Sequence, residues 1–195
     1  MLVLVGLGNP ESKYKLNRHN VGFMAIDSIV TRYKLAPYKI KFQSQLVTKK
    51  INDTPIIFSK PQTFMNLSGK SIGNILNFYK LKCENVIVIH DDLDLSLGII
   101  KTKIGGGSGG HNGLKSLDSI IGKNYRRLRI GIGHPGDKNL VNNYVLGNFS
   151  KSENFIINTL IKNISLNFDK IISNKEDNLS QLLAENISYK EKNGI

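Results

Sequence analysis

The sequence predicts an α/β protein: a single domain whose twisted, mixed and largely parallel central sheet is flanked by helices. Short buried strand-like runs alternate with amphipathic helical runs along the chain, which is the pattern of this class. The 195 residues also fit one core, because single cores usually stop growing only near ~250–300 residues. No repeat or linker interrupts the alternation, so one domain is expected over residues 1–195.

Strands are expected where short apolar runs end at turn residues. Residues 2–5 and 86–89 are continuous apolar runs, typical of central strands covered on both faces. Two further runs are joined through Asn52-Asp53, which predicts a hairpin. The expected strands span residues 2–5, 43–50, 55–59, 86–89, 99–104 and 127–132.

Helices are expected where apolar residues recur with helical spacing. Phe23, Ile26 and Ile29 share one face of the first helix, and Ser68 or Asn66 is expected to cap the second. The second helix is expected to carry Ile72, Ile75, Leu76 and Tyr79, and the other expected helices span residues 21–33, 112–121, 150–172 and 179–187. Between the last strands and helices we expect a mobile lid over residues 135–147.

The composition restricts the compartment and the class of protein. Hydrophobic residues make up 40% and charged residues 22%, as in ordinary globular chains. No apolar run approaches the ~18 residues needed to cross a bilayer, and the apolar residues 1–7 lack the basic lead-in of a signal peptide. Cys83 is the single cysteine, so no intramolecular disulfide can form. We therefore expect a cytoplasmic protein without membrane contacts.

The charge alone does not identify a partner. A net charge of +12 suggests a polyanion such as nucleic acid. However, 22 of the 27 basic residues are lysine, whereas arginine is the usual residue for forked phosphate contacts. A nucleic-acid partner and a generically basic, solvated surface both remain open.

Two phosphate-binding motifs fail on inspection. Gly6-Leu7-Gly8 follows a strand, but the third glycine of a dinucleotide-binding loop is replaced by Glu11, whose carboxylate has the wrong size and sign. Gly69-Lys70-Ser71 resembles the end of a P-loop, yet Phe64 stands where its first glycine is required. Cys83 has no visible activating base, which argues against a covalent nucleophile.

Polar residues gather where the predicted strands end. Asn9 follows the first strand, His90-Asp91 ends the fourth, and the loop Gly105–Gly110 follows the fifth. In open α/β sheets, ligands bind beyond the carboxyl ends of the strands. A binding cleft is therefore expected at this edge, where the glycine-rich loop could cradle a phosphate or act as a hinge.

Five segments together resemble the bacterial-type peptidyl-tRNA hydrolases, in order and spacing, over roughly residues 1–148. They are Gly6-Leu7-Gly8-Asn9-Pro10 with Tyr14 and Arg18-His19-Asn20-Val21-Gly22; Phe64-Met65-Asn66-Leu67-Ser68-Gly69-Lys70; His90-Asp91-Asp92-Leu93-Asp94; Gly105–Gly110 with His111-Asn112-Gly113-Leu114-Lys115; and Arg127 to Pro135. The chain departs from the family at Glu11, usually glycine, and at Asn17, usually threonine.

The resemblance implies hydrolysis of the ester that joins a peptide to the terminal ribose of tRNA, which recycles tRNA from peptides lost by stalled ribosomes. His19 matches the family's catalytic histidine and would act as general base on water, as expected for an imidazole near neutral pH. Asp91 matches the carboxylate that orients this imidazole. No metal and no organic cofactor is implied, and the only implied partner is peptidyl-tRNA, bound by a monomer without an obligate protein partner.

The same resemblance assigns substrate contacts. Asn9, Asn66 and Asn112 match amides around the catalytic histidine, although Asn112 could instead cap the helix that follows it. Tyr14 and Met65 match cleft-wall residues, and ordinary packing is their alternative role.

The resemblance also assigns tRNA contacts. Lys101 and Lys103 share one side of a strand and, with Arg129, match basic residues that hold the tRNA 5′ phosphate. Lys138, in the expected lid, would add a phosphate contact. The alternative is a solvated basic strand face.

Two other functions remain open from the residues alone. Asp91, Asp92 and Asp94 could bind magnesium in a nucleic-acid phosphoesterase. The same fold could also serve a non-catalytic RNA-binding factor.

Overall fold

The computed structural model describes residues 1–173, which form one seven-stranded sheet in the order β2-β3-β4-β1-β5-β7-β6. The strands are β1 (Leu2–Gly6), β2 (Lys39–Lys41), β3 (Ser44–Ile51), β4 (Thr54–Pro61), β5 (Val86–Asp92), β6 (Ile100–Ile104) and β7 (Arg126–Gly131). The inner strands β4, β1, β5 and β7 run parallel, and β2, β3 and β6 are added antiparallel at the edges. The predicted mixed, largely parallel sheet is confirmed. The short, exposed β2 was not predicted, because it carries no apolar run.

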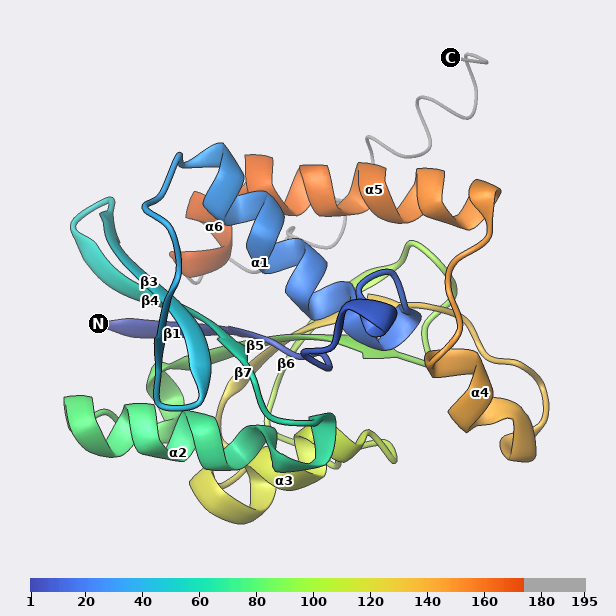
Figure 1. Ribbon diagram of the computed structural model, residues 1–195, viewed down its shortest axis with the longest axis horizontal. Helices are drawn as coiled ribbons and strands as arrows, with labels where there is room; N and C mark the ends of the chain where they lie inside the picture. Colours follow the sequence, from blue (N-terminus) through green and yellow to red (C-terminus); the bar gives the residue numbers. More distant parts are fainter. Residues whose placement is uncertain (174–195) are drawn as a thin grey trace.

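Helices cover both faces of the sheet (Figure 1). The α-helices are α1 (Val21–Arg32), α2 (Ser68–Tyr79), α3 (Asn112–Ile121), α4 (Val141–Val145), α5 (Lys151–Leu166) and α6 (Phe168–Ile172). The 3-10 helices are η1 (Ser12–Tyr14), η2 (Arg18–Asn20), η3 (Met65–Leu67), η4 (Cys83–Asn85) and η5 (Lys138–Leu140). Leu4 of β1 packs in the layer of α1, α5 and α6, whereas its neighbours Val3 and Val5 pack in the layer of α2 and α3. This alternation follows from the two-residue period of a strand.

Two predictions about the helices are wrong. The single helix expected over residues 150–172 is interrupted at Asn167, whose side chain donates to the Asn163 carbonyl at 3.0 Å and competes with the helical backbone. Neither Ser68 nor Asn66 caps α2. Leu67 holds the N-cap position, and the Ser68 hydroxyl donates to the Met65 carbonyl instead.

Two further predictions concern the segment 135–147 and the chain after residue 173. The helix α4 and the 3-10 helix η5 lie within the segment 135–147, for which a mobile lid was predicted. The helix expected over residues 179–187 lies outside the described residues. No helix within residues 1–173 is long and apolar enough to cross a membrane.

Two glycines bring the start of α1 directly against the sheet. A Cβ atom at Gly22 would lie 2.4 Å from the Ile89 carbonyl oxygen, and one at Gly6 would lie 2.3 Å from the Gly22 carbonyl oxygen. The backbones of α1, β1 and β5 can therefore approach only because both side chains are absent. This contact places η2, which immediately precedes α1, at the carboxyl end of β5.

Candidate active site

A cleft of about 1000 Å³ opens at the carboxyl edge of the sheet. It is bounded by the loop after β1, by η3, by the end of β5, by the glycine-rich loop before α3, and by α4. Eight of the predicted site residues line it: Asn9, Tyr14, His19, Met65, Asn66, Asp91, Asn112 and Lys138. The expected position beyond the strand ends is confirmed.

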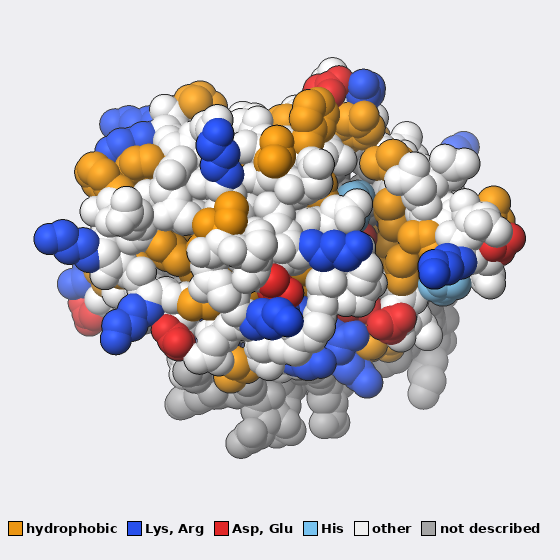
Figure 2. Space-filling model, turned by 90° about the horizontal axis from the view of Figure 1, so that it is seen from below, with side chains coloured by type: hydrophobic (Ala, Val, Ile, Leu, Met, Phe, Trp, Pro, Cys, Tyr) orange, Lys and Arg blue, Asp and Glu red, His pale blue; other side chains and the backbone are white. Residues whose placement is uncertain are grey.

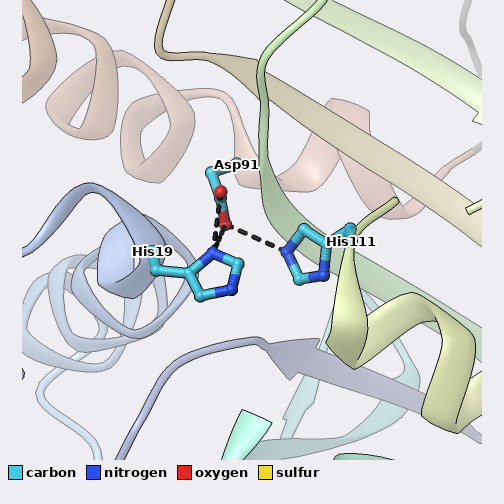
Figure 3. A group of neighbouring side chains, drawn as sticks. All are labelled: His19, Asp91 and His111. Carbon is cyan, nitrogen blue, oxygen red and sulfur yellow. Dashed lines mark hydrogen bonds and ion pairs between the residues drawn. The ribbon is translucent and has the colours of Figure 1, made fainter. Parts of the chain in front are cut away.

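His19 and Asp91 form the central hydrogen bond of the cleft (Figure 3). Both are buried, with 7% and 3% of their surface exposed. The His19 Nδ1 atom lies 2.8 and 2.9 Å from the two carboxylate oxygens of Asp91. An ionised carboxylate only accepts, so Nδ1 carries the proton and donates it. The other ring nitrogen, Nε2, points away from Asp91 and keeps its lone pair.

Opposing effects determine the pKa values of this pair. Burial lowers the pKa of His19, but the charge and hydrogen bond of Asp91 outweigh it, and the pKa is raised above 6.5. Burial raises the pKa of Asp91, yet the two neighbouring imidazoles, His19 and His111, hold it well below its ordinary value. Asp91 therefore stays ionised, and its charge favours the protonated form of the His19 imidazole.

A second histidine, His111, donates to the same carboxylate. Its Nε2 atom lies 3.0 Å from Asp91 Oδ1, while its Nδ1 accepts from the backbone N–H groups of Gly113 and Leu114 at 3.1 and 3.4 Å. Because Nδ1 accepts, the ring is neutral with its proton on Nε2. His111, not Asn112, is the N-cap of α3. This role was not predicted from the sequence, since histidine is not among the usual capping residues.

A third histidine, His90, packs its ring against His111 with the centroids 5.2 Å apart. Its Nδ1 donates to the Asp91 carbonyl at 2.6 Å. Burial, together with His111, lowers the pKa of His90 to about 3, so the ring is neutral at working pH. Asp91 thus has its backbone and its side chain contacted by imidazoles.

Amide side chains flank the histidine pair. Asn9 is buried, and its side-chain oxygen accepts from the Met65 backbone N–H at 2.9 Å, which leaves its NH₂ group to donate. Asn20 fixes the Asn9 backbone through two hydrogen bonds of 2.9 Å. Asn66 in η3 and Asn112 at the start of α3 are exposed and line the cleft. The cleft therefore presents uncharged donors beside the imidazole of His19.

The two predicted wall residues differ in burial. Met65 is 4% exposed. A Cβ atom at Gly113 would lie only 2.5 Å from the Met65 sulfur, so the missing side chain at Gly113 leaves room for Met65. Tyr14 is half-buried in η1 and lines the cleft. Both are placed as wall residues.

Three of the four predicted phosphate-binding residues lie outside the cleft lining, on the β6–β7 edge. Lys101 pairs with Arg129 in the strand register, and Lys103 pairs with Arg127. The Arg129 Nε atom donates to Asp92 Oδ2 at 2.7 Å, which leaves its terminal nitrogens to contact a ligand. On the face formed by α2 and α3, basic side chains are scattered among acidic ones (Figure 2). Lys138 belongs to the cleft instead.

The glycine-rich loop is held from behind by a buried arginine. Arg127 is 3% exposed and donates to the carbonyls of Gly107 and Gly106 at 2.7 and 3.0 Å. With these carbonyls turned inward, Gly109 and Gly110, both at positive φ, carry the loop to the cleft. The loop is thus anchored at its first half.

The acidic residues do not converge as a magnesium site requires. Both oxygens of Asp91 accept from imidazoles, while those of Asp92 accept from Arg129 and from the Asp94 backbone N–H. The alternative of a magnesium-dependent phosphoesterase is therefore not supported. Within residues 1–173, His19, Asp91 and His111 are the group whose ligand atoms lie close enough for a metal ion, within 4.8 Å of one another. The ring nitrogens of His19 and His111 lie 2.8 and 3.0 Å from the Asp91 carboxylate oxygens, which is the distance of a hydrogen bond.

An imidazole held by a buried carboxylate, beside neutral amide donors in an α/β cleft, is an arrangement typical of hydrolases. The family model described as peptidyl-tRNA hydrolase matches residues 3–192. The chain belongs to this peptidyl-tRNA hydrolase family, and it is a hydrolase.

Relatives and solved structures agree with this membership. A peptidyl-tRNA hydrolase of Rhizobium etli is 46% identical over 184 residues, which are 94% of this chain and 77% of the relative. One of Brucella ovis is 49% identical over 183 residues, covering 91% and 73%. The crystal structure of peptidyl-tRNA hydrolase from Acinetobacter baumannii superimposes with a TM-score of 0.88 at 34% identity, covering 95% of each chain.

Proposed function

We propose that this enzyme hydrolyses the ester bond between a peptide, or an N-blocked aminoacyl group, and the terminal ribose of tRNA. The observation that carries the proposal is the buried hydrogen bond between His19 and Asp91 in a cleft that also holds Asn9, Asn66 and Asn112. The names of the relatives supply the substrate, and the geometry supplies the chemical groups that such an ester requires.

In the first step, His19 Nε2 removes a proton from water, and the hydroxide formed attacks the ester carbonyl carbon. The imidazolium that results is stabilised by Asp91, whose carboxylate already accepts from Nδ1. Asn9, Asn66 or Asn112 donates to the developing oxyanion, and one such donor is worth about 3–4 kcal/mol.

In the second step, the tetrahedral intermediate collapses and the bond to the ribose oxygen breaks. The Nε2–H of the imidazolium returns its proton to this oxygen, so the products are a free peptide carboxyl group and a ribose hydroxyl. His19 is neutral again at the end of the cycle. No group outside the described residues is needed for these proton transfers.

Recognition of the tRNA is assigned to the β6–β7 edge. Lys101, Lys103 and the terminal nitrogens of Arg129 are proposed to bind the 5′ phosphate of the acceptor end, which also separates elongator tRNAs from an initiator whose end pairing differs. Lys138, from the cleft wall, is proposed to contact a phosphate near the ester. A monomer acting in the cytoplasm, without an obligate protein partner, remains our prediction.

The proposal is tested with N-blocked aminoacyl-tRNA and, in parallel, with a minimal N-blocked aminoacyl ester that needs no magnesium to fold. Wild type should cleave both, and EDTA should leave cleavage of the minimal ester nearly unchanged. His19→Ala should lower the rate about 10²–10⁴-fold while tRNA binding stays nearly intact.

Each part of the proposal has its own contradicting result. Binding of tRNA without turnover by wild type would indicate an RNA-binding factor. Loss of minimal-ester cleavage in EDTA would indicate a metal-dependent enzyme, and full activity of His19→Ala would remove His19 as the base.

A further inference from the structure

A buried arginine connects the segment that carries His19 to the far wall of the cleft. Arg18 directly precedes His19 in η2, and its side chain is 10% exposed. Its Nη2 atom donates to both carboxylate oxygens of Glu153 at 3.1 and 2.9 Å, and Nη1 donates to the Asn148 carbonyl at 2.8 Å. The guanidinium also lies 4.2 Å from the centroid of the Tyr144 ring. Arg18 therefore joins η2 to α4 and to the start of α5.

Backbone contacts reinforce this connection. The Arg18 N–H donates to the Gly147 carbonyl at 3.0 Å, and the Asn17 side chain donates to the Leu146 carbonyl. Asn17 and Asn148 also form an isolated antiparallel bridge. Asn17 is one of the two positions at which the chain departs from the family pattern, and here its amide serves to hold the chain just after α4.

Glu153 receives Arg18 and at the same time fixes the start of α5. It accepts from the Ser150 backbone N–H at 2.6 Å, while its own N–H donates to the Ser150 hydroxyl, which is a capping box. Burial raises the pKa of Glu153, but the hydrogen bonds from Ser150 and Arg18 outweigh it and lower the pKa. The carboxylate is therefore ionised and held on both sides.

The helix held by this cluster forms one wall of the cleft. The α4 wall, defined as Val141, Asn142, Val145 and Leu146, lines the same cleft as His19. The Tyr144 hydroxyl, between these residues, donates to the Ile132 carbonyl at 2.6 Å just beyond β7. Figure 1 shows α4 at the same end of the sheet as the start of α1.

Three consecutive residues of η2 thus reach three different parts of the cleft. Arg18 reaches α4 and α5, His19 reaches Asp91 on β5, and Asn20 reaches Asn9 after β1. Because η2 is a single short turn, a shift of Arg18 changes the distance between His19 and the α4 wall.

We propose that Arg18 is a positioning residue of this enzyme: through Glu153 and Asn148 it sets the α4 wall against His19 and so determines how tightly substrate binds. The proposal rests on the proposed function, since the α4 wall must contact the substrate. A pair with a purely structural role would change stability but not the affinity for substrate.

The test compares Arg18→Lys and Glu153→Gln with a matched pair elsewhere in the molecule. Both substitutions keep a similar length but remove the forked contact or its charge. The matched control is Asp27→Asn, because Asp27 pairs at 2.5 Å with Lys60, whose side chain is also 10% exposed. That pair joins α1 to β4, and neither residue lines the cleft.

Arg18→Lys and Glu153→Gln should each raise KM for N-blocked aminoacyl-tRNA about tenfold, with kcat within about twofold of wild type. Amide hydrogen exchange over residues 138–147 should accelerate in both variants. The Asp27→Asn control should keep the wild-type KM and the wild-type exchange over this segment, whatever it does to Tm.

Equal KM values in Arg18→Lys, Asp27→Asn and wild type would overturn the proposal, as would a fall in kcat at constant KM. Unchanged amide hydrogen exchange over residues 138–147 in both Arg18→Lys and Glu153→Gln would overturn it as well. If wild type cleaves no ester at all, the proposed function fails, and the exchange measurement alone then decides whether Arg18 holds α4.

Discussion

The cleft at the carboxyl ends of the strands and the β6–β7 edge of the sheet are two polar regions that are built in opposite ways. In the cleft, His19 and Asp91 are buried, His111 is partly buried, and the three side chains are joined by hydrogen bonds of 2.8–3.0 Å. On the edge, Lys101 and Lys103 are exposed. Buried pairs act through fixed geometry, whereas exposed charges act through a field that water and salt screen. We therefore propose that the first region carries the chemistry and the second the recognition of tRNA.

Asp91→Asn tests the cleft side of this comparison and should have the largest effect. The amide keeps the shape but loses the charge that stabilises the imidazolium, so kcat should fall by about 10²–10⁴-fold. Asp91 also raises the pKa of His19, so its loss lowers that pKa and should move the acid limb of kcat/KM to lower pH. A pH–rate profile with wild-type position and height would remove Asp91 from the mechanism.

Lys103→Ala and Arg129→Ala test the edge. Each should raise KM for full-length N-blocked aminoacyl-tRNA about tenfold. Each should also reduce the slope of log KM against log salt concentration by about the share of one phosphate contact. A minimal aminoacyl ester should be cleaved as by wild type, because it has no 5′ phosphate. Equal losses on both substrates would place these residues at the chemistry and abolish the proposed division.

Substitution of His111 should have the smallest effect and separates its two roles. His111→Asn keeps an N-cap side chain but loses the donor to Asp91, so we expect a few-fold lower kcat at nearly unchanged stability. His111→Ala loses both and should also cost about 1 kcal/mol in the free energy of unfolding. Denaturant unfolding and steady-state rates measure the two effects. Identical stability of the two variants would contradict the capping role.

The order of strands and helices could be predicted from the sequence because the central strands β1 and β5 begin with continuous apolar runs and the helices carry apolar residues at helical spacing. The carboxyl-edge location of Asp91 followed from the same pattern. The break at Asn167 and the strand β2 could not be predicted, since both depend on side-chain contacts or pairing rather than on apolar period.

The site was predicted less by local pattern than by family resemblance. Nothing in the residues around His19 indicates that its ring meets a carboxylate 72 positions later. The hydrogen bonds from His111 to Asp91 and from Arg18 to Glu153 were not predicted for the same reason, because their acceptors belong to other elements. Local pattern indicates which elements form, whereas tertiary contact decides which side chains meet.

The absence of side chains at Gly6 and Gly22 has a consequence for heat inactivation. Because the start of α1, directly after the turn that carries His19, contacts the core strands through backbone atoms, we expect this turn and the sheet to lose their structure together on heating. Activity and native circular dichroism should therefore disappear together on warming, with no inactive yet folded intermediate between them.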